Sequence, residues 1–157
     1  MKRIASFVVL ASALVASPTL ALADATETNT NKVPAAATDY DNAKKAIARK
    51  DWKSAIASLE AAQRSDPKDA DVQNLLGYSY RKSGNLDAAF PHYARALELN
   101  PKHLGAHEYV GEAYLMAGKP AKAKEHLAQL EQFCPQGCEE RDDLRRAIAE
   151  YERKAGR

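Results

Sequence analysis

A 34-residue spacing between equivalent residues is the feature that most constrains the fold of this 157-residue chain. Three dipeptides that end in proline share this spacing: Asp66-Pro67, Asn100-Pro101 and Cys134-Pro135. One alanine of each period shows the same 34-residue spacing: Ala55, Ala89 and Ala123. A period of this length is typical of repeat architectures, in which each unit buries its apolar face against its neighbours.

Each period predicts two helices. Ala, Leu, Lys, Glu and Arg dominate from Asp39 onward, and all five favour helix. Gly84 is the kind of residue that stands just past a helix end, and Pro101 cannot extend a helix, so they divide the period 70–103 into two helical segments. We expect the small residues Gly77 and Ala89 to face each other where these two helices cross.

The order of residue types within the period resembles the tetratricopeptide repeat. The second period carries the pattern at Leu76, Gly77, Tyr80, Ala89, Tyr93, Ala96 and Pro101. The third carries it at Val110, Gly111, Tyr114, Ala123, Leu127 and Pro135. The resemblance implies an all-α fold, an α-α superhelical solenoid of three helix-turn-helix repeats at about 36–69, 70–103 and 104–137. The first repeat is degenerate, because Ala46 and Lys50 stand where Tyr and Gly are usual.

A further amphipathic helix is predicted after the last repeat, over residues 139–154. Its apolar positions form one stripe at helical spacing: Leu144, Ala147, Ile148 and Tyr151. Acidic residues crowd its start and basic residues its end, which matches the helix dipole. A helix with one apolar face and one charged face suits the end of a stacked array. We therefore expect a tetratricopeptide domain over 38–157 that ends in a capping helix.

The N-terminal residues predict export. Lys2 and Arg3 precede a short apolar run, and Ala21-Leu22-Ala23 fits a cleavage site, so residues 1–23 are expected to be a cleaved signal peptide. Residues 24–37 contain few large apolar side chains and are expected to form a flexible leader. The segment 127–140, which contains Cys134-Pro135 and Cys138, resembles a tail found on small exported bacterial tetratricopeptide proteins, and we interpret the protein as one of these. We expect it in the periplasm, or else secreted, and free of the membrane after cleavage.

The charge balance argues against a nucleic-acid partner. The whole chain has 23 basic and 21 acidic residues, and removal of the signal peptide takes away two basic residues, so the remainder is neutral. The sequence contains no nucleotide-binding, metalloprotease or serine-hydrolase motif. We therefore expect a non-enzymatic protein without a cofactor, a catalytic residue or a metal site.

The resemblance implies that the first helices of the repeats line a concave groove that binds a protein or peptide. By the family register this face carries Tyr40, Lys44, Ile47, Asn74, Tyr78, Arg81, Lys82, Glu108, Glu112, Leu115 and Met116. These residues predict a groove that is basic and aromatic in the second repeat and acidic and apolar in the third. Family members that bind chaperone tails need a Lys/Asn/Asn/Lys/Arg set. The positions aligned with that set hold Tyr40, Lys44, Leu75, Gly105 and Tyr109, which does not predict chaperone-tail binding.

The cysteine pair leaves two interpretations. Cys134 and Cys138 flank a Pro-Gln-Gly turn and, in an exported chain, are expected to form a structural disulfide. The alternative is a copper or thiol-redox carrier that uses the same pair.

The histidines and the first repeat each suggest a further possibility. His103 and His107 are spaced so that they could form a metal-binding pair, whereas His92 and His126 are expected to be solvated. The first repeat has no preceding helix, so self-association through its apolar residues is a further possibility. Those residues are Ile47, Trp52, Ile56 and Leu59.

Overall fold

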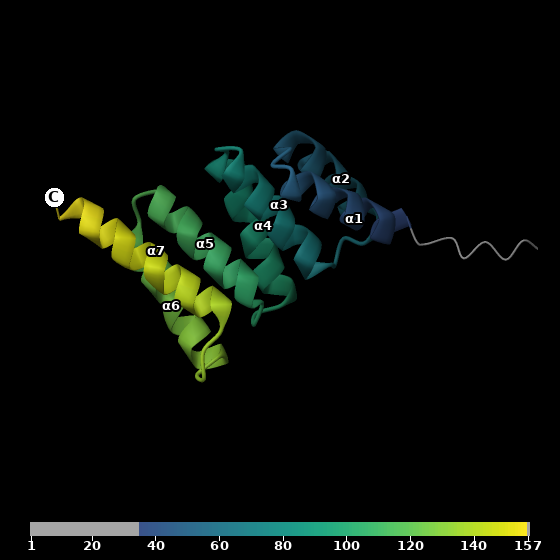
Figure 1. Ribbon diagram of the computed structural model, residues 1–157. Coiled ribbons are helices and arrows are strands. Elements are labelled where there is room, and N and C mark those ends of the chain that lie inside the picture. Colours follow the sequence, from purple (N-terminus) through teal and green to yellow (C-terminus); the bar gives the residue numbers. More distant parts are fainter. Residues whose placement is uncertain (1–34, 157) are drawn as a thin grey trace, which may run out of the picture. The chain divides into compact units, whose positions relative to one another are not determined.

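The computed structural model describes residues 35–156 of the chain. These residues form seven helices (Figure 1): α1 (Ala35–Ala48), α2 (Trp52–Ser65), α3 (Ala70–Lys82), α4 (Leu86–Leu99), α5 (Leu104–Met116), α6 (Pro120–Phe133) and α7 (Glu139–Ala155). Within that range there is no strand, so the predicted all-α repeat fold is confirmed. The expected signal peptide (1–23) and most of the expected leader (24–37) lie outside the described residues, and α1 already begins at Ala35.

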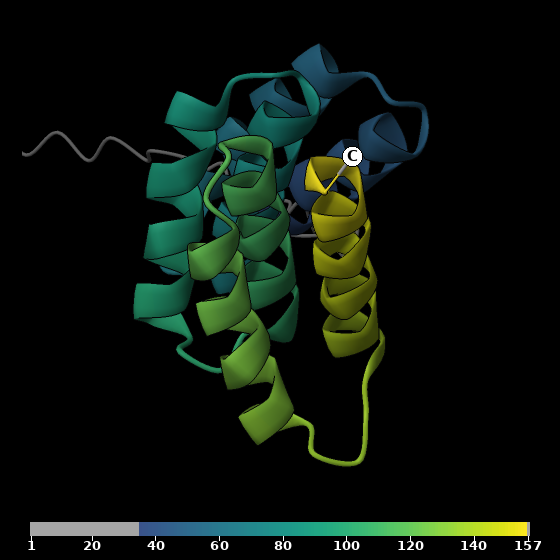
Figure 2. The same cartoon turned by 90° about the vertical axis from the view of Figure 1, so that its left-hand side faces the viewer.

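The helices stack as three antiparallel pairs followed by a single helix. α1 packs on α2, α3 on α4 and α5 on α6, and neighbouring pairs meet through α2–α3, α4–α5 and α3–α5. α7 packs against α5 and α6 and stands beside that pair in the view along the stack (Figure 2). α5 has buried residues around its circumference because α3, α4, α6 and α7 all contact it. None of the described helices is both long and apolar enough to cross a membrane.

The residues that the spacing marks as helix ends have equivalent backbone geometry. Asp66, Asn100 and Cys134 are the C-caps of α2, α4 and α6, and each donates its backbone N–H to the carbonyl four residues earlier. Gly84 and Gly118 stand in the turns inside the second and third repeats, with φ of 88° and 70°. Lys50 occupies the equivalent turn of the first repeat with φ of 58°, a conformation that costs a non-glycine residue about 1–2 kcal/mol.

A buried aromatic ring explains the glycine in the second repeat. A Cβ atom at Gly77 would lie 2.6 Å from Cδ1 and Cε1 of Tyr93, which is fully buried in α4. The atoms nearest to such a Cβ all belong to the Tyr93 ring. The expectation that Gly77 faces Ala89, which is also fully buried in α4, stays a prediction. Gly77 lets α3 approach this ring, and the ring fills the space between the helices of the repeat.

Gly111, the equivalent glycine of the third repeat, makes room for a side chain of the last helix, α7. A Cβ at Gly111 would lie 2.6 Å and 2.7 Å from the two Cδ atoms of Leu144, a fully buried residue of α7. Leu144 and Ile148 are the buried residues of α7, and Ala147 and Tyr151 pack beside them. The predicted apolar stripe therefore attaches α7 to the α5–α6 pair.

The histidines are more enclosed than their sequence positions indicate. His92 Nδ1 lies 2.9 Å from Gln73 Oε1, and the Nδ1 atoms of His107 and His126 are 2.9 Å apart. Burial and the neighbouring His107 lower the pKa of His126 to about 4. The expectation that His92 and His126 are solvated is wrong, because each ring stacks on the tyrosine of its own repeat. These pairs are Tyr80–His92 and Tyr114–His126.

Candidate partner-binding groove

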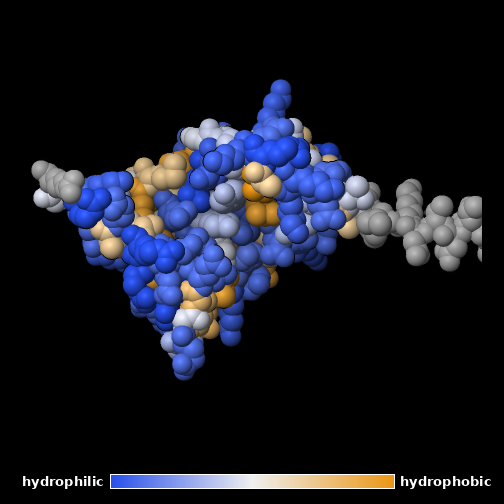
Figure 3. All heavy atoms as spheres, in the orientation of Figure 1, coloured by the Kyte–Doolittle hydropathy of each residue, from blue (hydrophilic) through white to orange (hydrophobic). Residues whose placement is uncertain are grey.

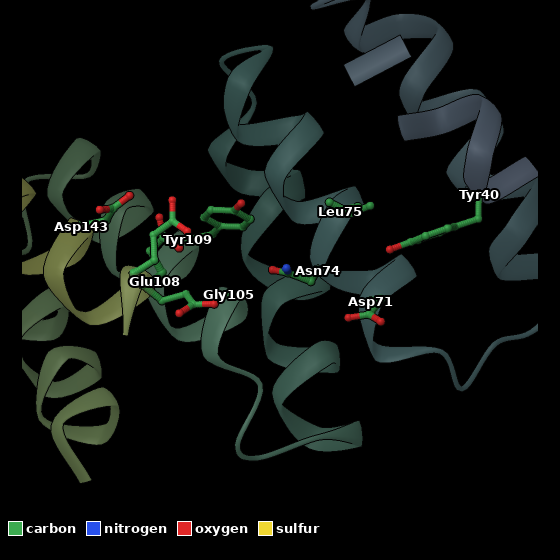
Figure 4. A pocket seen from close by; sticks show the side chains of 10 residues that line it. Tyr40, Asp71, Asn74, Leu75, Gly105, Glu108, Tyr109 and Asp143 are labelled. Atoms are coloured by element: carbon green, nitrogen blue, oxygen red, sulfur yellow. The ribbon is translucent and has the colours of Figure 1, made fainter. Parts of the chain in front are cut away.

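The helices α1, α3, α5 and α7 together line a pocket of about 310 Å³, which we call the acidic pocket (Figure 4). Its lining consists of Tyr40, Asp71, Asn74, Leu75, Gly105, Glu108, Tyr109, Glu139, Glu140 and Asp143. Five of these residues are carboxylates, and the lining includes no Lys, Arg or His. The lining residues of α3, α5 and α7 come from the N-terminal halves of these helices.

A second pocket, which we call the mixed pocket, has a volume of about 400 Å³ and lies toward the C-terminal ends of α3, α5 and α7. It is lined by Arg81, Lys82, Glu112, Leu115, Met116, Ala147, Glu150, Tyr151 and Lys154. Met116 is 55% exposed and is the large hydrophobic residue that stands out to solvent within the described part of the chain. The face shown in Figure 3 is mostly hydrophilic, with small separate apolar patches.

Arg81 joins the helices that carry the two pockets. Only 6% of Arg81 is exposed, its Nη1 lies 2.6 Å from Oε2 of Glu112, and its Nε donates a 3.3 Å hydrogen bond to the hydroxyl of Tyr93. The guanidinium also lies over the rings of Tyr78 and Tyr109, at 5.5 Å and 5.6 Å from their centroids. Arg81 thus connects α3 with α4 and α5.

This ion pair corrects the predicted charge gradient of the groove. Arg81 was expected to make the second repeat basic, and Glu112 to make the third repeat acidic. The two side chains instead form an ion pair with each other. The difference in charge instead runs along the helix axes. Carboxylates gather near the N-terminal ends of the lining helices, and Lys82 and Lys154 lie near the C-terminal ends.

Two profiles of one family match the chain. Both carry the description "Tetratricopeptide repeat"; one matches residues 40–102 and the other residues 80–148, so that together they cover more than half of the chain. The chain belongs to the tetratricopeptide repeat family. Among curated relatives, Superkiller complex protein 3 of Homo sapiens is 36% identical over 75 residues, which is 48% of this chain. The match covers only 5% of the length of that relative.

Solved tetratricopeptide domains share the fold. The structure titled "TPR2B-domain:pHsp70-complex of yeast Sti1" superposes with a TM-score of 0.70 at 16% identity, covering 76% of this chain and 98% of the other. The structure titled "First TPR of Spaghetti (RPAP3) bound to HSP90 peptide SRMEEVD" gives 0.65 at 19% identity, covering 71% and 89%. At these identities the likeness establishes the common fold.

Most of the groove residues expected from the repeat register lie in or between the two pockets. Tyr40, Asn74 and Glu108 line the acidic pocket, and the mixed pocket takes a larger set: Arg81, Lys82, Glu112, Leu115 and Met116. Tyr78 lies between them, with ring centroids 6.0 Å from Trp52 and 4.8 Å from Tyr109.

Besides Tyr78, two of the expected groove residues line neither pocket. Lys44 is exposed, with its Nζ 5.5 Å from the centroid of the Tyr40 ring. Ile47 packs against the core of the first repeat. Leu59 is fully buried in that core, whereas Ile47, Trp52 and Ile56 are partly exposed, and self-association through the first repeat stays a prediction.

The last helix contributes residues to both pockets, although its sequence pattern predicted only a cap. Glu139, Glu140 and Asp143 line the acidic pocket. The mixed pocket receives Ala147, Glu150, Tyr151 and Lys154. The repeat register could not place these side chains because α7 lies outside the period. The one sequence feature that could have indicated a binding site in α7 is the cluster of acidic residues at its start. Such a cluster also arises because acidic side chains stabilise the N-terminal end of a helix dipole.

Glu108 is the most perturbed carboxyl group of the acidic pocket. Burial raises its pKa to about 8, and the nearby carboxylates of Glu112, Asp143 and Glu140 act in the same direction. Arg81 opposes this rise in pKa but is itself paired with Glu112. A cation placed among these carboxylates would relieve their mutual repulsion.

Replacing Glu108 with glutamine is expected to stabilise the protein in alkaline solution. The raised pKa means that the native state favours the protonated carboxyl, so wild-type stability is fully present below about pH 4.5 and falls as the pH rises toward about 8. Glu108→Gln places a neutral side chain at this position at every pH. Its free energy of unfolding at pH 9 is expected to exceed that of the wild type by about 1–2 kcal/mol, after discounting for solvent screening. Urea unfolding at pH 4 and pH 9 measures the effect.

The matched control removes a carboxylate from an exposed surface. Glu125→Gln on α6 breaks the ion pair with Lys122 and is expected to change stability by less than about 1 kcal/mol at either pH. Equal unfolding free energies for Glu108→Gln and the wild type at pH 9 would contradict the prediction.

The two sulfur atoms of Cys134 and Cys138 lie 2.10 Å apart, at disulfide distance, and join the end of α6 to the start of α7. His103 and His107 do not converge on a common point. The ring of His103 accepts the backbone N–H of Ala106, whereas His107 contacts His126 and the carbonyl of Pro101. In residues 35–156 no three His, Cys, Asp or Glu side chains are placed to hold a metal ion.

Proposed function

We propose that this protein is a non-enzymatic binding module that holds an extended segment of a partner protein along α3, α5 and α7. The observation that carries this proposal is the pair of pockets that these three helices line toward their opposite ends. The tetratricopeptide fold generally serves as an interaction scaffold, and the titles of two similar structures name complexes with chaperone proteins or peptides. The exposed side chain of Met116 provides an apolar contact of the kind enriched at interfaces.

The partner differs in charge from the chaperone peptide named in one of those titles. That peptide, SRMEEVD, contains one Arg and ends in Glu-Glu-Val-Asp, whereas the acidic pocket would repel the carboxylates of such an ending. The sequence also lacks the residue set with which family members bind chaperone tails, which again argues against an acidic chaperone peptide as the partner. The partner is therefore expected to present a different chemistry to this groove.

The proposed compartment is the periplasm. Residues 1–23 have the pattern of a cleaved signal peptide, and a cysteine pair at disulfide distance suits an oxidising compartment.

The alternative function, a copper or thiol-redox carrier, requires two free thiols at Cys134 and Cys138. Alkylation of the native protein before and after reduction distinguishes a carrier from a structural disulfide.

Site-specific photocrosslinking tests the binding groove. A photoreactive phenylalanine analogue at Met116, in the mixed pocket, is expected to form a discrete adduct with a partner protein in intact cells. The matched position is Ala57, which is exposed on α2 and lines neither pocket. Adducts from Ala57 but none from Met116 would place the interaction elsewhere and refute the proposal.

A further inference from the structure

The acidic pocket contains more negative charge than the described chain neutralises. His103 Nε2 lies 3.0 Å from Asp71, and Arg146 pairs with Asp143. Within residues 35–156, Glu108, Glu139 and Glu140 have no ion-pair partner. Acidic residues in the first turn of a helix are stabilised by its dipole, which accounts for Asp71, Glu139 and Glu140. Glu108 and Asp143 lie beyond the first turns of α5 and α7, so the dipole does not account for them.

Asn74 gives an independent indication of a ligand. This pocket-lining residue is only 5% exposed, and its Oδ1 atom has no hydrogen-bond partner. A buried acceptor without a donor costs about 1–3 kcal/mol, so a ligand that donates a hydrogen bond would recover part of this free energy. Figure 4 shows the Asn74 amide between the side chains of Glu108 and Tyr109 on one side and Asp71 on the other. The pocket thus offers carboxylate and amide acceptors around one space.

The volume and lining of the pocket suit a single side chain. A space of about 310 Å³ bordered by Tyr40 and Tyr109 accommodates a guanidinium or ammonium group with its aliphatic stem. Arg81 already lies over Tyr78 and Tyr109, which shows that the aromatic rings of this face accept a guanidinium. The required ligand carries positive charge, several hydrogen-bond donors and no carboxylate.

We propose that the acidic pocket binds the arginine or lysine side chain of an extended partner segment, with Glu108, Asp143 and Asn74 as its principal acceptors. This inference rests on the proposed function, since the segment is the one that continues into the mixed pocket. Glu108 and Met116 lie on one helix, α5, about 12 Å apart along its axis. An extended chain spans that distance in about four residues. The preferred segment therefore has a basic residue and an apolar residue about four positions apart.

Synthetic peptides test the proposal on the purified full-length protein at pH 8.5 and low salt. The probe is a ten-residue acetylated and amidated peptide of Gly, Ser and Ala with one Arg and, four positions later, one Leu. Its matched control has citrulline in place of Arg, which keeps the shape and removes the charge. The Arg peptide is expected to bind at least about tenfold more tightly and to shift the side-chain amide resonance of Asn74 in NMR spectra.

Variants locate the effect in the pocket. Glu108→Gln combined with Asp143→Asn is expected to abolish the preference for Arg over citrulline, whereas Glu125→Gln, which changes the charge outside the pocket, leaves it intact. Equal binding of the two peptides to the wild type, or binding of neither, would overturn the cation proposal. If free argininamide binds as tightly as the Arg peptide, the claim that the ligand is an extended segment is wrong. None of these results depends on photocrosslinking at Met116, so the proposed function is judged separately.

Discussion

Tyr93→Ala is expected to destabilise the protein by about 3–5 kcal/mol, the usual cost of truncating a buried aromatic residue to alanine. Tyr93 is the largest fully buried side chain of the described structure. The change also removes the hydroxyl that accepts a hydrogen bond from the buried Arg81. Since small domains are stable by only about 5–15 kcal/mol, the variant should approach the unfolding threshold. Urea denaturation followed by circular dichroism measures the loss.

Two companion variants separate the ring from the hydroxyl. Tyr93→Phe keeps the ring and should lose about 1–3 kcal/mol, because it leaves the buried Nε of Arg81 without its acceptor. Gly77→Ala should destabilise the wild type, because its Cβ would meet the ring at 2.6 Å, but should be tolerated once Tyr93 is alanine. Additive effects of Gly77→Ala and Tyr93→Ala would show that the ring does not impose the glycine. A Tyr93→Phe loss as large as that of Tyr93→Ala would assign the stability to the hydroxyl.

Gly111→Val is expected to weaken the attachment of α7 while leaving the first two repeats folded. The new side chain would overlap the Cδ atoms of the buried Leu144, and overpacking of this kind costs about 1–3 kcal/mol. α7 packs against α5 and α6, so the loss should be local to the end of the stack. Hydrogen exchange should show lost protection in α7 and little change in α1–α4.

The same variant connects stability with binding. α7 supplies three of the five carboxylates of the acidic pocket, so its release should also lower affinity for the arginine peptide. Met116→Val, at an exposed position of the same helix, controls for a β-branched residue in α5 and should leave α7 protected. A uniform loss of protection across all the helices would show that α7 is not a separable unit.

The repeat pattern was sufficient to predict the helices because it depends on local chemistry. Proline and the residue before it end a helix whatever surrounds them, and the C-caps Asp66, Asn100 and Cys134 share one geometry. The same register placed Asn74, Glu108 and Met116 on the lining of the two pockets. It could not show that Arg81 and Glu112 form an ion pair, because the separation of their side chains depends on how closely α3 packs on α5.

Sequence alone determined the number of helices, their order and the residues at most of their ends, because those depend on backbone preferences and on a 34-residue period; the start of α1 at Ala35, inside the expected leader, is the exception. Only the tertiary structure decided which helices line the pockets, that α7 is one of them, and which partners Gly77 and Gly111 accommodate. These features depend on contacts between side chains far apart in the chain. In particular, the charge of the acidic pocket arises from carboxylates on three helices that only the packing of α3, α5 and α7 brings together.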